Sequence, residues 1–140
     1  MARPCAGVGL PLETPAAFPQ NGLLAARCTL ALPEASRAAF VKAVYTANFA
    51  EGALISDPEI ISRCIVAAGE SPEAIMARAG DETIKAELKA NTEEAMRRGV
   101  FGSPTFFADD GEMFWGNDRL EDAFDWLAAP LQIMSIGGTR

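Results

Sequence analysis

The chain has 140 residues, of which 49% are hydrophobic, and its formal net charge is −7. This length predicts at most one domain with a packed core, and the negative charge argues against nucleic acids and anionic membranes as partners, because phosphate binding needs a basic patch. The chain contains no histidine, which excludes Ser-His-Asp and Cys-His catalysis and removes most transition-metal sites, so no metal is expected.

The three cysteines, Cys5, Cys28 and Cys64, form neither a C-x-x-C pair nor a zinc-binding spacing. Two of them fall on apolar stripes of expected helices, where a free cysteine fills the core. The N-terminus lacks the apolar run of a signal peptide, and no stretch reaches the roughly 18 apolar residues of a membrane span. We therefore expect a cytoplasmic protein.

Residues 1–20 contain four prolines and are expected to form an irregular lead. Helix start signals and apolar spacing then predict a helical domain over residues 21–98. Its five expected helices cover residues 21–32, 33–50, 57–69, 71–80 and 81–98. In the last of them, Ile84, Leu88 and Met96 are expected to form the buried side.

The sequence pattern of residues 99–129 predicts a β-hairpin followed by a helix. Thr105–Ala108 and Glu112–Trp115 are the two strands, and Asp110-Gly111 suits the tight turn between them. Both faces of the hairpin are apolar, which is typical of a layered α/β core with further strands beside it. The last helix begins at Asp118, and residues 130–140 are expected to form a tail.

The residues around this hairpin suggest a binding site, and each has a plainer explanation. Ser103-Pro104 either contains a cis bond that turns the Ser103 backbone outward or opens the strand in trans. Asn117 and Asp118 begin a helix, where free N–H groups and a carboxylate suit an amino-acid head group, although Asp118 also suits a simple helix cap.

The aromatic pair just before Gly116 also has two possible roles. Phe114 and Trp115 either line an aromatic pocket or belong to the core.

Four segments resemble the 2-hydroxychromene-2-carboxylate isomerase family, in order and spacing from about Pro11 to Leu127. That family is kin to the kappa-class glutathione transferases and to the DsbA-like branch of thioredoxin folds. The segments are FPQNGLLAAR at 18–27, ISDP at 55–58, ANTEEA at 90–95 and GVFGSPTFF…MFWGNDRL at 99–120.

The resemblance implies an α/β, thioredoxin-like fold of the DsbA/kappa-transferase type, with a mostly helical inserted domain followed by a β-hairpin and a C-terminal helix. It further implies glutathione as cofactor: Ser103 pairs with it through the backbone before a cis Pro104, and Asn117 and Asp118 hold its γ-glutamyl head. Asn21 lies near the ligand in this family, although from the residues alone it is equally a helix cap.

With Phe114 and Trp115, Asn21 completes the expected pocket for an aromatic-derived substrate. The reaction implied is an isomerisation through thiol addition in the catabolism of aromatic compounds.

One departure from the family pattern is large. The family's first βα unit carries a Ser-Pro-Tyr-like motif whose Ser steadies the thiolate, and this sequence shows no such unit. We therefore expect a family member lacking its N-terminal βα portion, with no assigned catalytic residue and with weak or no turnover by itself.

Three alternatives stay open from the sequence. The chain could be a kappa-type glutathione transferase, a DsbA-like thiol oxidoreductase, or a noncatalytic binding or assembly module. In the last case the hairpin would pair with a strand from another chain, in a homodimer or with a strand-supplying partner.

Overall fold

The computed structural model describes residues 2–128, so the tail expected over 130–140 lies outside the described residues. The chain divides into two compact units, Met1–Glu93 and Glu94–Arg140, which we call the helical unit and the hairpin unit. Each has its own cluster of buried apolar side chains. The single core that the length predicted is therefore replaced by two.

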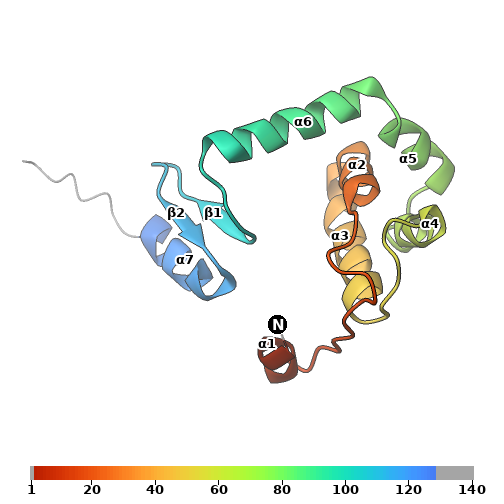
Figure 1. Cartoon of the computed structure of the whole chain (residues 1–140). Helices are drawn as coiled ribbons and strands as arrows, with labels where there is room; N and C mark the ends of the chain where they lie inside the picture. Colours follow the sequence, from red (N-terminus) through yellow and green to blue (C-terminus); the bar gives the residue numbers. More distant parts are fainter. Residues whose placement is uncertain (1, 129–140) are drawn as a thin grey trace, which may run out of the picture. The chain divides into compact units, whose positions relative to one another are not determined.

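The helical unit contains the five expected helices (Figure 1). These are α2 (Leu23–Ala31), α3 (Glu34–Phe49), α4 (Pro58–Ala67), α5 (Pro72–Ala79) and α6 (Glu82–Arg97), whose last residues belong to the hairpin unit. The expected irregular lead is wrong for its first residues, because α1 (Ala2–Gly7) is helical. Pro4 is compatible with this because it lies in the first turn, where its missing N–H has no helical partner.

The core of the helical unit lies between helices that begin where the sequence signals predicted. The Asp57 carboxylate accepts a hydrogen bond from the Glu59 N–H (2.9 Å) at the start of α4. The Ser71 hydroxyl accepts one from the Ala74 N–H (3.5 Å) at the start of α5. Helix α2 packs on α5, and α3 packs on α4. The largest fully buried side chains are those of Phe40, Leu32, Ile61, Ile65 and Cys28.

Helix α6 differs from its expected amphipathic form. Ile84 is buried and Leu88 is half-buried, but Met96 is 72% exposed. The buried side expected along the whole helix is therefore confirmed only at its beginning. Most of the surface of α6 is polar and charged. None of the helices in the described residues is long and apolar enough to cross a membrane.

The hairpin unit contains β1 (Thr105–Phe107), β2 (Met113–Trp115), the 3₁₀ turn η1 (Asn117–Arg119) and α7 (Leu120–Ala128). The strands are antiparallel, with Phe106 opposite Phe114. The Ala108 N–H bonds to the Glu112 carbonyl (2.9 Å), and Gly111, with φ +92°, completes the tight turn as expected.

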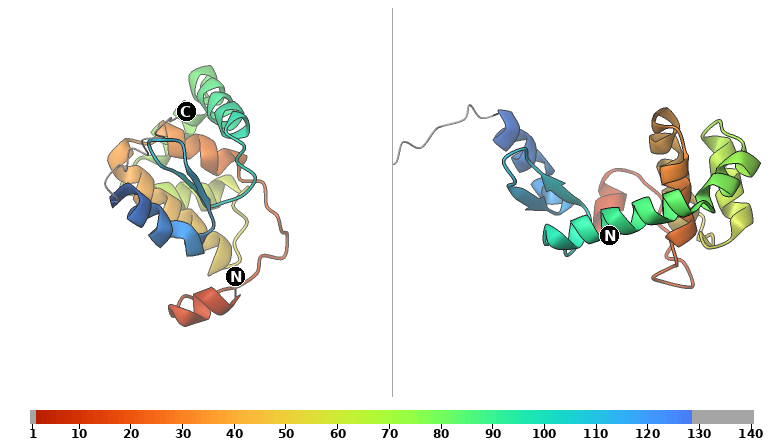
Figure 2. Two further views of the ribbon diagram at one scale, coloured as in Figure 1. Left: turned by 90° about the vertical axis from the view of Figure 1, so that its left-hand side faces the viewer. Right: turned by 90° about the horizontal axis from the view of Figure 1, so that it is seen from above.

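Helix α7 covers one face of this hairpin, as Figure 1 and the right-hand view of Figure 2 show. Phe106, Ala108 and Phe114 pack there with Ala123 of α7. Within residues 2–128 the sheet contains only β1 and β2. The described part of the hairpin unit is thus a two-stranded sheet with one covering helix.

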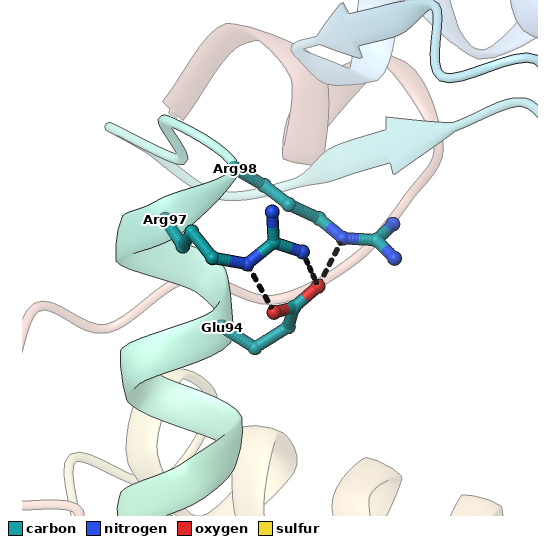
Figure 3. A network of polar contacts seen from close by, with 3 residues as sticks. All are labelled: Glu94, Arg97 and Arg98. Carbon is teal, nitrogen blue, oxygen red and sulfur yellow. Dashed lines mark hydrogen bonds and ion pairs between the residues drawn. The ribbon is translucent and has the colours of Figure 1, made fainter.

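The last turn of α6 carries a compact charge network (Figure 3). The Glu94 carboxylate accepts hydrogen bonds from Arg97 (Nε, 2.8 Å, and Nη2, 2.6 Å) and from Arg98 (Nε, 2.7 Å). The Arg98 guanidinium also lies 5.1 Å from the centre of the Phe107 ring, a cation–π distance. Glu94 therefore helps to hold the end of α6 against β1.

These contacts lower the pKa of Glu94 from 4.5 to about 2, chiefly through the hydrogen bonds from Arg97 and then from Arg98. Because the folded-state pKa is below the unfolded value, the network stabilises the fold above pH 4.5 and is lost as the pH falls towards 2. We expect a carboxyl-carbon NMR titration of Glu94 to give a midpoint near pH 2. The double variant Arg97→Gln, Arg98→Gln should return it towards 4.5, and an ordinary midpoint in the native chain would contradict the network.

Candidate functional site

The predicted glutathione-binding residues come together at the open end of the hairpin. The Ser103–Pro104 peptide bond is cis, as the resemblance implied. The Gly116 N–H donates a hydrogen bond to the Pro104 carbonyl (3.0 Å), which continues the β1–β2 register past the strand ends. Ser103 and Pro104 therefore lie beside the segment that contains Asn117 and Asp118.

The outer edge of β1 is unpaired. In an antiparallel pair, alternate residues face the partner strand. The carbonyl of Pro104 and the N–H of Ala108 bond to the β2 side, so Thr105 and Phe107 direct their N–H and C=O groups to the other edge. Within the described residues this edge has no strand partner, and Ser103 lies two residues before Thr105, at its beginning, so an extended peptide could pair there.

A second group of hydrogen-bonding sites lies where β2 passes into α7. Gly116 has φ 108° and ψ 152°, a backbone region essentially reserved for glycine. After it, the Arg119 N–H bonds to the Gly116 carbonyl (3.2 Å), and the Leu120 N–H bonds to that of Asn117. Within the described residues this leaves the N–H groups of Asn117 and Asp118 without a protein partner.

Asp118 is not the cap that its position in the sequence suggested. It is the second residue of η1, and the N-cap position is Gly116, where no side chain caps the turn. The Asp118 carboxylate is solvent-exposed and lies so close to Gly116 that a Cβ atom there would clash with it. Two free N–H groups beside a free carboxylate can bind the carboxylate and ammonium of an α-amino acid.

The two aromatic candidates have separate positions. Phe114 is 5% exposed and packs in the core under α7, with its ring centre 6.2 Å from that of Trp126. The expectation that Phe114 lines a pocket is therefore corrected, because the pleat turns it towards α7. Trp115 is 50% exposed on the opposite face, with the Phe101 ring 4.9 Å away.

Gly102 allows this position of Trp115, because a Cβ atom on Gly102 would collide with the indole Nε1. Trp115 and Phe101 thus form an exposed aromatic surface close in sequence to Ser103.

Asn21 belongs to the helical unit and has a structural role. Its side-chain oxygen accepts a hydrogen bond from the Leu23 N–H (2.9 Å) at the start of α2. The N-cap position of α2 is Gly22, so Asn21 precedes the cap, and a role of Asn21 beside a ligand stays a prediction.

Sequence reasoning missed Asn48. It is the only polar residue among the buried side chains of the described chain, and it lines a cavity of the helical unit. One signal was available, since Asn48 follows Val44 by four residues and must share the buried face of α3.

The chain is similar to a known protein family, to two relatives and to a solved structure. A family model described as a DSBA-like thioredoxin domain matches residues 1–127. The chain is 34% identical over 83 residues to a 2-hydroxychromene-2-carboxylate isomerase from Sphingobium xenophagum, and 37% identical over 90 residues to a protein of that name from Pseudomonas putida. These matches cover 59% and 62% of this chain, and 42% of each relative.

A solved structure of a 2-hydroxychromene-2-carboxylate isomerase (HCCA isomerase) is similar over 91% of this chain and 63% of its own. The TM-score is 0.73 and the sequence identity is 30%. The chain therefore spans about two fifths of the curated relatives and less than two thirds of the solved one.

The cysteines bear on the thiol oxidoreductase alternative. Cys28 and Cys64 are buried in the core, as expected, and Cys5 is half-buried. Burial raises the pKa of Cys28 from 9.0 to about 11. Burial also raises the pKa of Cys64, an effect that nearby Arg63 partly opposes. Because the thiolate is the reactive form, neither residue suits redox catalysis.

We expect a disulfide reagent such as DTNB to react at pH 7 with Cys5, while Cys28 and Cys64 react only after unfolding in urea. In a Cys5→Ser variant, the rate of labelling by DTNB should equal the slow rate at which the helical unit opens. The raised pKa of Cys28 has a second consequence. The folded chain keeps the thiol proton to higher pH than the unfolded chain does, so the free energy of unfolding should fall as the pH rises from 9 towards 11. Rapid labelling of Cys5→Ser at pH 7 would show an exposed thiol and revive the redox alternative.

Proposed function

The chain belongs to the family of DsbA-like thioredoxin domains, and from this premise we propose that it acts in glutathione-dependent isomerisation of the 2-hydroxychromene-2-carboxylate type. Two relatives and one solved structure carry that enzyme name. Since the chain spans only part of each of them, the activity, the cofactor and the substrate are proposals for this chain.

The observation that carries the proposal is that the unpaired outer edge of β1, which Ser103 precedes, lies beside the N–H groups of Asn117 and Asp118, which have no partner within the described residues. Glutathione has one group for each of these sites. Its cysteinyl peptide unit offers an N–H and a C=O, which the Ser103 backbone can pair with as one strand pairs with another. Its γ-glutamyl end offers a carboxylate for the two N–H groups and an ammonium for the Asp118 carboxylate.

Bound glutathione would supply a thiol nucleophile that adds reversibly to a conjugated double bond and so permits rotation with no net change of atoms or electrons. The chain's own part is to hold the tripeptide by its backbone and head group. Trp115 and Phe101 offer an exposed aromatic surface on which a flat substrate can stack. The isomerisation itself requires no redox cysteine, which fits the buried thiols of Cys28 and Cys64.

Two alternatives share part of this support. A kappa-type transferase would use the same tripeptide-binding groups but would consume glutathione as a conjugate. A binding or assembly module would use the free edge of β1 for a strand of another protein, with Ser103 in the same backbone role.

The activity is tested by following 2-hydroxychromene-2-carboxylate spectroscopically with and without glutathione. We expect at most slow conversion, and only with the thiol, because no residue of this chain is assigned to steady the thiolate. The glutathione concentration should stay constant, because a catalyst regenerates it. Conversion that needs no thiol would contradict the proposal. Net consumption of glutathione would favour the transferase.

The binding site is tested separately by isothermal titration calorimetry with glutathione. Asp118→Asn removes the charge that faces the ammonium and should weaken binding about tenfold, the effect typical of a charge-assisted hydrogen bond. Asp109→Asn is the matched control, because Asp109 is an exposed carboxylate in the hairpin turn of the same unit. Equal losses in both variants, or no binding by the native chain, would reject the site.

A further inference from the structure

Helices α2 and α6 border a groove of about 530 Å³ that the glutathione proposal does not use. Every residue that lines it lies between Gly22 and Glu93, within the helical unit. Its volume lies within the usual range for small-molecule sites. The wall combines apolar surface with positive charge, supplied respectively by Leu23, Ala26 and Leu88 and by Arg27, Lys85 and Lys89.

Arg27 carries the charge in this groove that no protein group neutralises. It takes part in none of the ion pairs found within the described residues. Its Nε is buried and has no hydrogen-bond partner there. A partly buried charge without a counter-ion is unfavourable, because burial removes part of its hydration. An anion beside the guanidinium would therefore stabilise this side chain.

The terminal nitrogens of Arg27, and not Nε, are the atoms that a ligand can reach. The residue as a whole is half-buried, and within the described residues neither Nη atom is buried without a partner, as Nε is. Arg27 also donates none of the side-chain hydrogen bonds that arginines form in this part of the chain. Because the charge is delocalised over the guanidinium, an anion at the two Nη groups balances it without contact to Nε.

The guanidinium of Arg27 lies near the first turn of α6. The pKa of Glu82 in that turn is lowered, chiefly by the hydrogen bond and the charge of Lys85 and further by the charge of Arg27. Arg27 thus lies close enough to act on Glu82, although the two form no ion pair. Arg27 and Lys85 therefore approach one another from the two helices that border the groove.

The two lysines of the groove already have acidic partners. Lys85 pairs with Glu82 (2.7 Å), and Lys89 pairs with Glu93 (3.6 Å). Arg27 therefore leaves one positive charge in excess, on a chain whose net charge is −7. A single excess charge suits a monoanion, and the planar fork of an arginine matches the two oxygens of a carboxylate.

Apolar side chains lie beside this charge. Leu23 of α2 is 47% exposed, and Leu88 of α6 is half-buried, so both present apolar surface to the groove. Covering such surface favours the binding of a ligand with an apolar body.

We propose that this groove binds a small organic monocarboxylate, whose oxygens accept hydrogen bonds from the Nη groups of Arg27 while its apolar body lies along Leu23 and Leu88. The positive charge selects an anion, and the leucines select an acid with a hydrocarbon chain. The proposal stands apart from the glutathione site of the hairpin unit, and its test contains no glutathione.

The probes are hexanoate and hexanamide, which match in size and differ in charge. Each is titrated into the full chain at neutral pH by isothermal titration calorimetry. We expect hexanoate to bind about tenfold more tightly, the gain typical of a charge-assisted hydrogen bond. Acetate, which has the charge but no apolar chain, should bind more weakly than hexanoate. Equal affinity of hexanoate with either of the other two, or no saturable binding of hexanoate, would overturn the proposal.

Variants locate the site. Arg27→Gln removes the charge and should lower the affinity for hexanoate to that for hexanamide. Arg78→Gln is the matched control, because Arg78 is an exposed arginine of α5 that forms no ion pair within the described residues, and it should keep the native preference. A preference for hexanoate that survives Arg27→Gln in a folded protein, as judged by circular dichroism, would overturn the assignment.

A second pair of variants does not depend on the folding of Arg27→Gln. Thr92 and Asn91 are both exposed on α6, but only Thr92 lines the groove. Thr92→Glu places a second carboxylate in the groove and should weaken hexanoate several-fold by repulsion, with hexanamide unaffected. Asn91→Glu makes the same change of charge outside the groove and should bind hexanoate nearly as the native chain does. Equal effects of the two variants on hexanoate would show that it binds elsewhere and would reject the site.

Discussion

The candidate thiol site depends on one backbone hydrogen bond, which runs from the Gly116 N–H to the Pro104 carbonyl over 3.0 Å. It extends the pairing of β1 and β2 beyond their last residues, so two segments that are distant in sequence lie side by side. The same bond is in register with the pairing of β1, in which the N–H and C=O of Thr105 point away from β2. The conformation of Gly116, open only to glycine, lets the chain leave β2 with the next two N–H groups unpaired.

Helix α6 carries few buried side chains. Ile84 is buried near its beginning and Leu88 is half-buried, whereas the end of the helix carries Glu94 and its two arginine partners. The charge network is a contact within the hairpin unit, where Arg98 reaches the Phe107 ring.

Burial determines the chemistry of the groups in the helical unit. Cys28 and Cys64 are potential nucleophiles by residue type, but the apolar core keeps them protonated and inert. Asn48 is an ordinary polar residue, yet the same burial leaves its Oδ1 without a hydrogen-bond partner within the described residues, which is unfavourable. In both cases the surroundings, and not the residue type alone, decide how the group behaves.

The sequence by itself determined the local structure of this protein: the starts of α4 and α5 at Asp57 and Ser71, the hairpin with its turn at Gly111, and the family. These features depend on short-range chemistry, namely capping, turn conformation and alternation. Only the tertiary structure decided that Phe114 is a core residue, that Asp118 is not a helix cap, and that Asn48 lines a cavity. The first depends on the packing of α7 against the hairpin, the second on the backbone conformation at Gly116, and the third on which segments meet around α3. Residue type alone determines none of these.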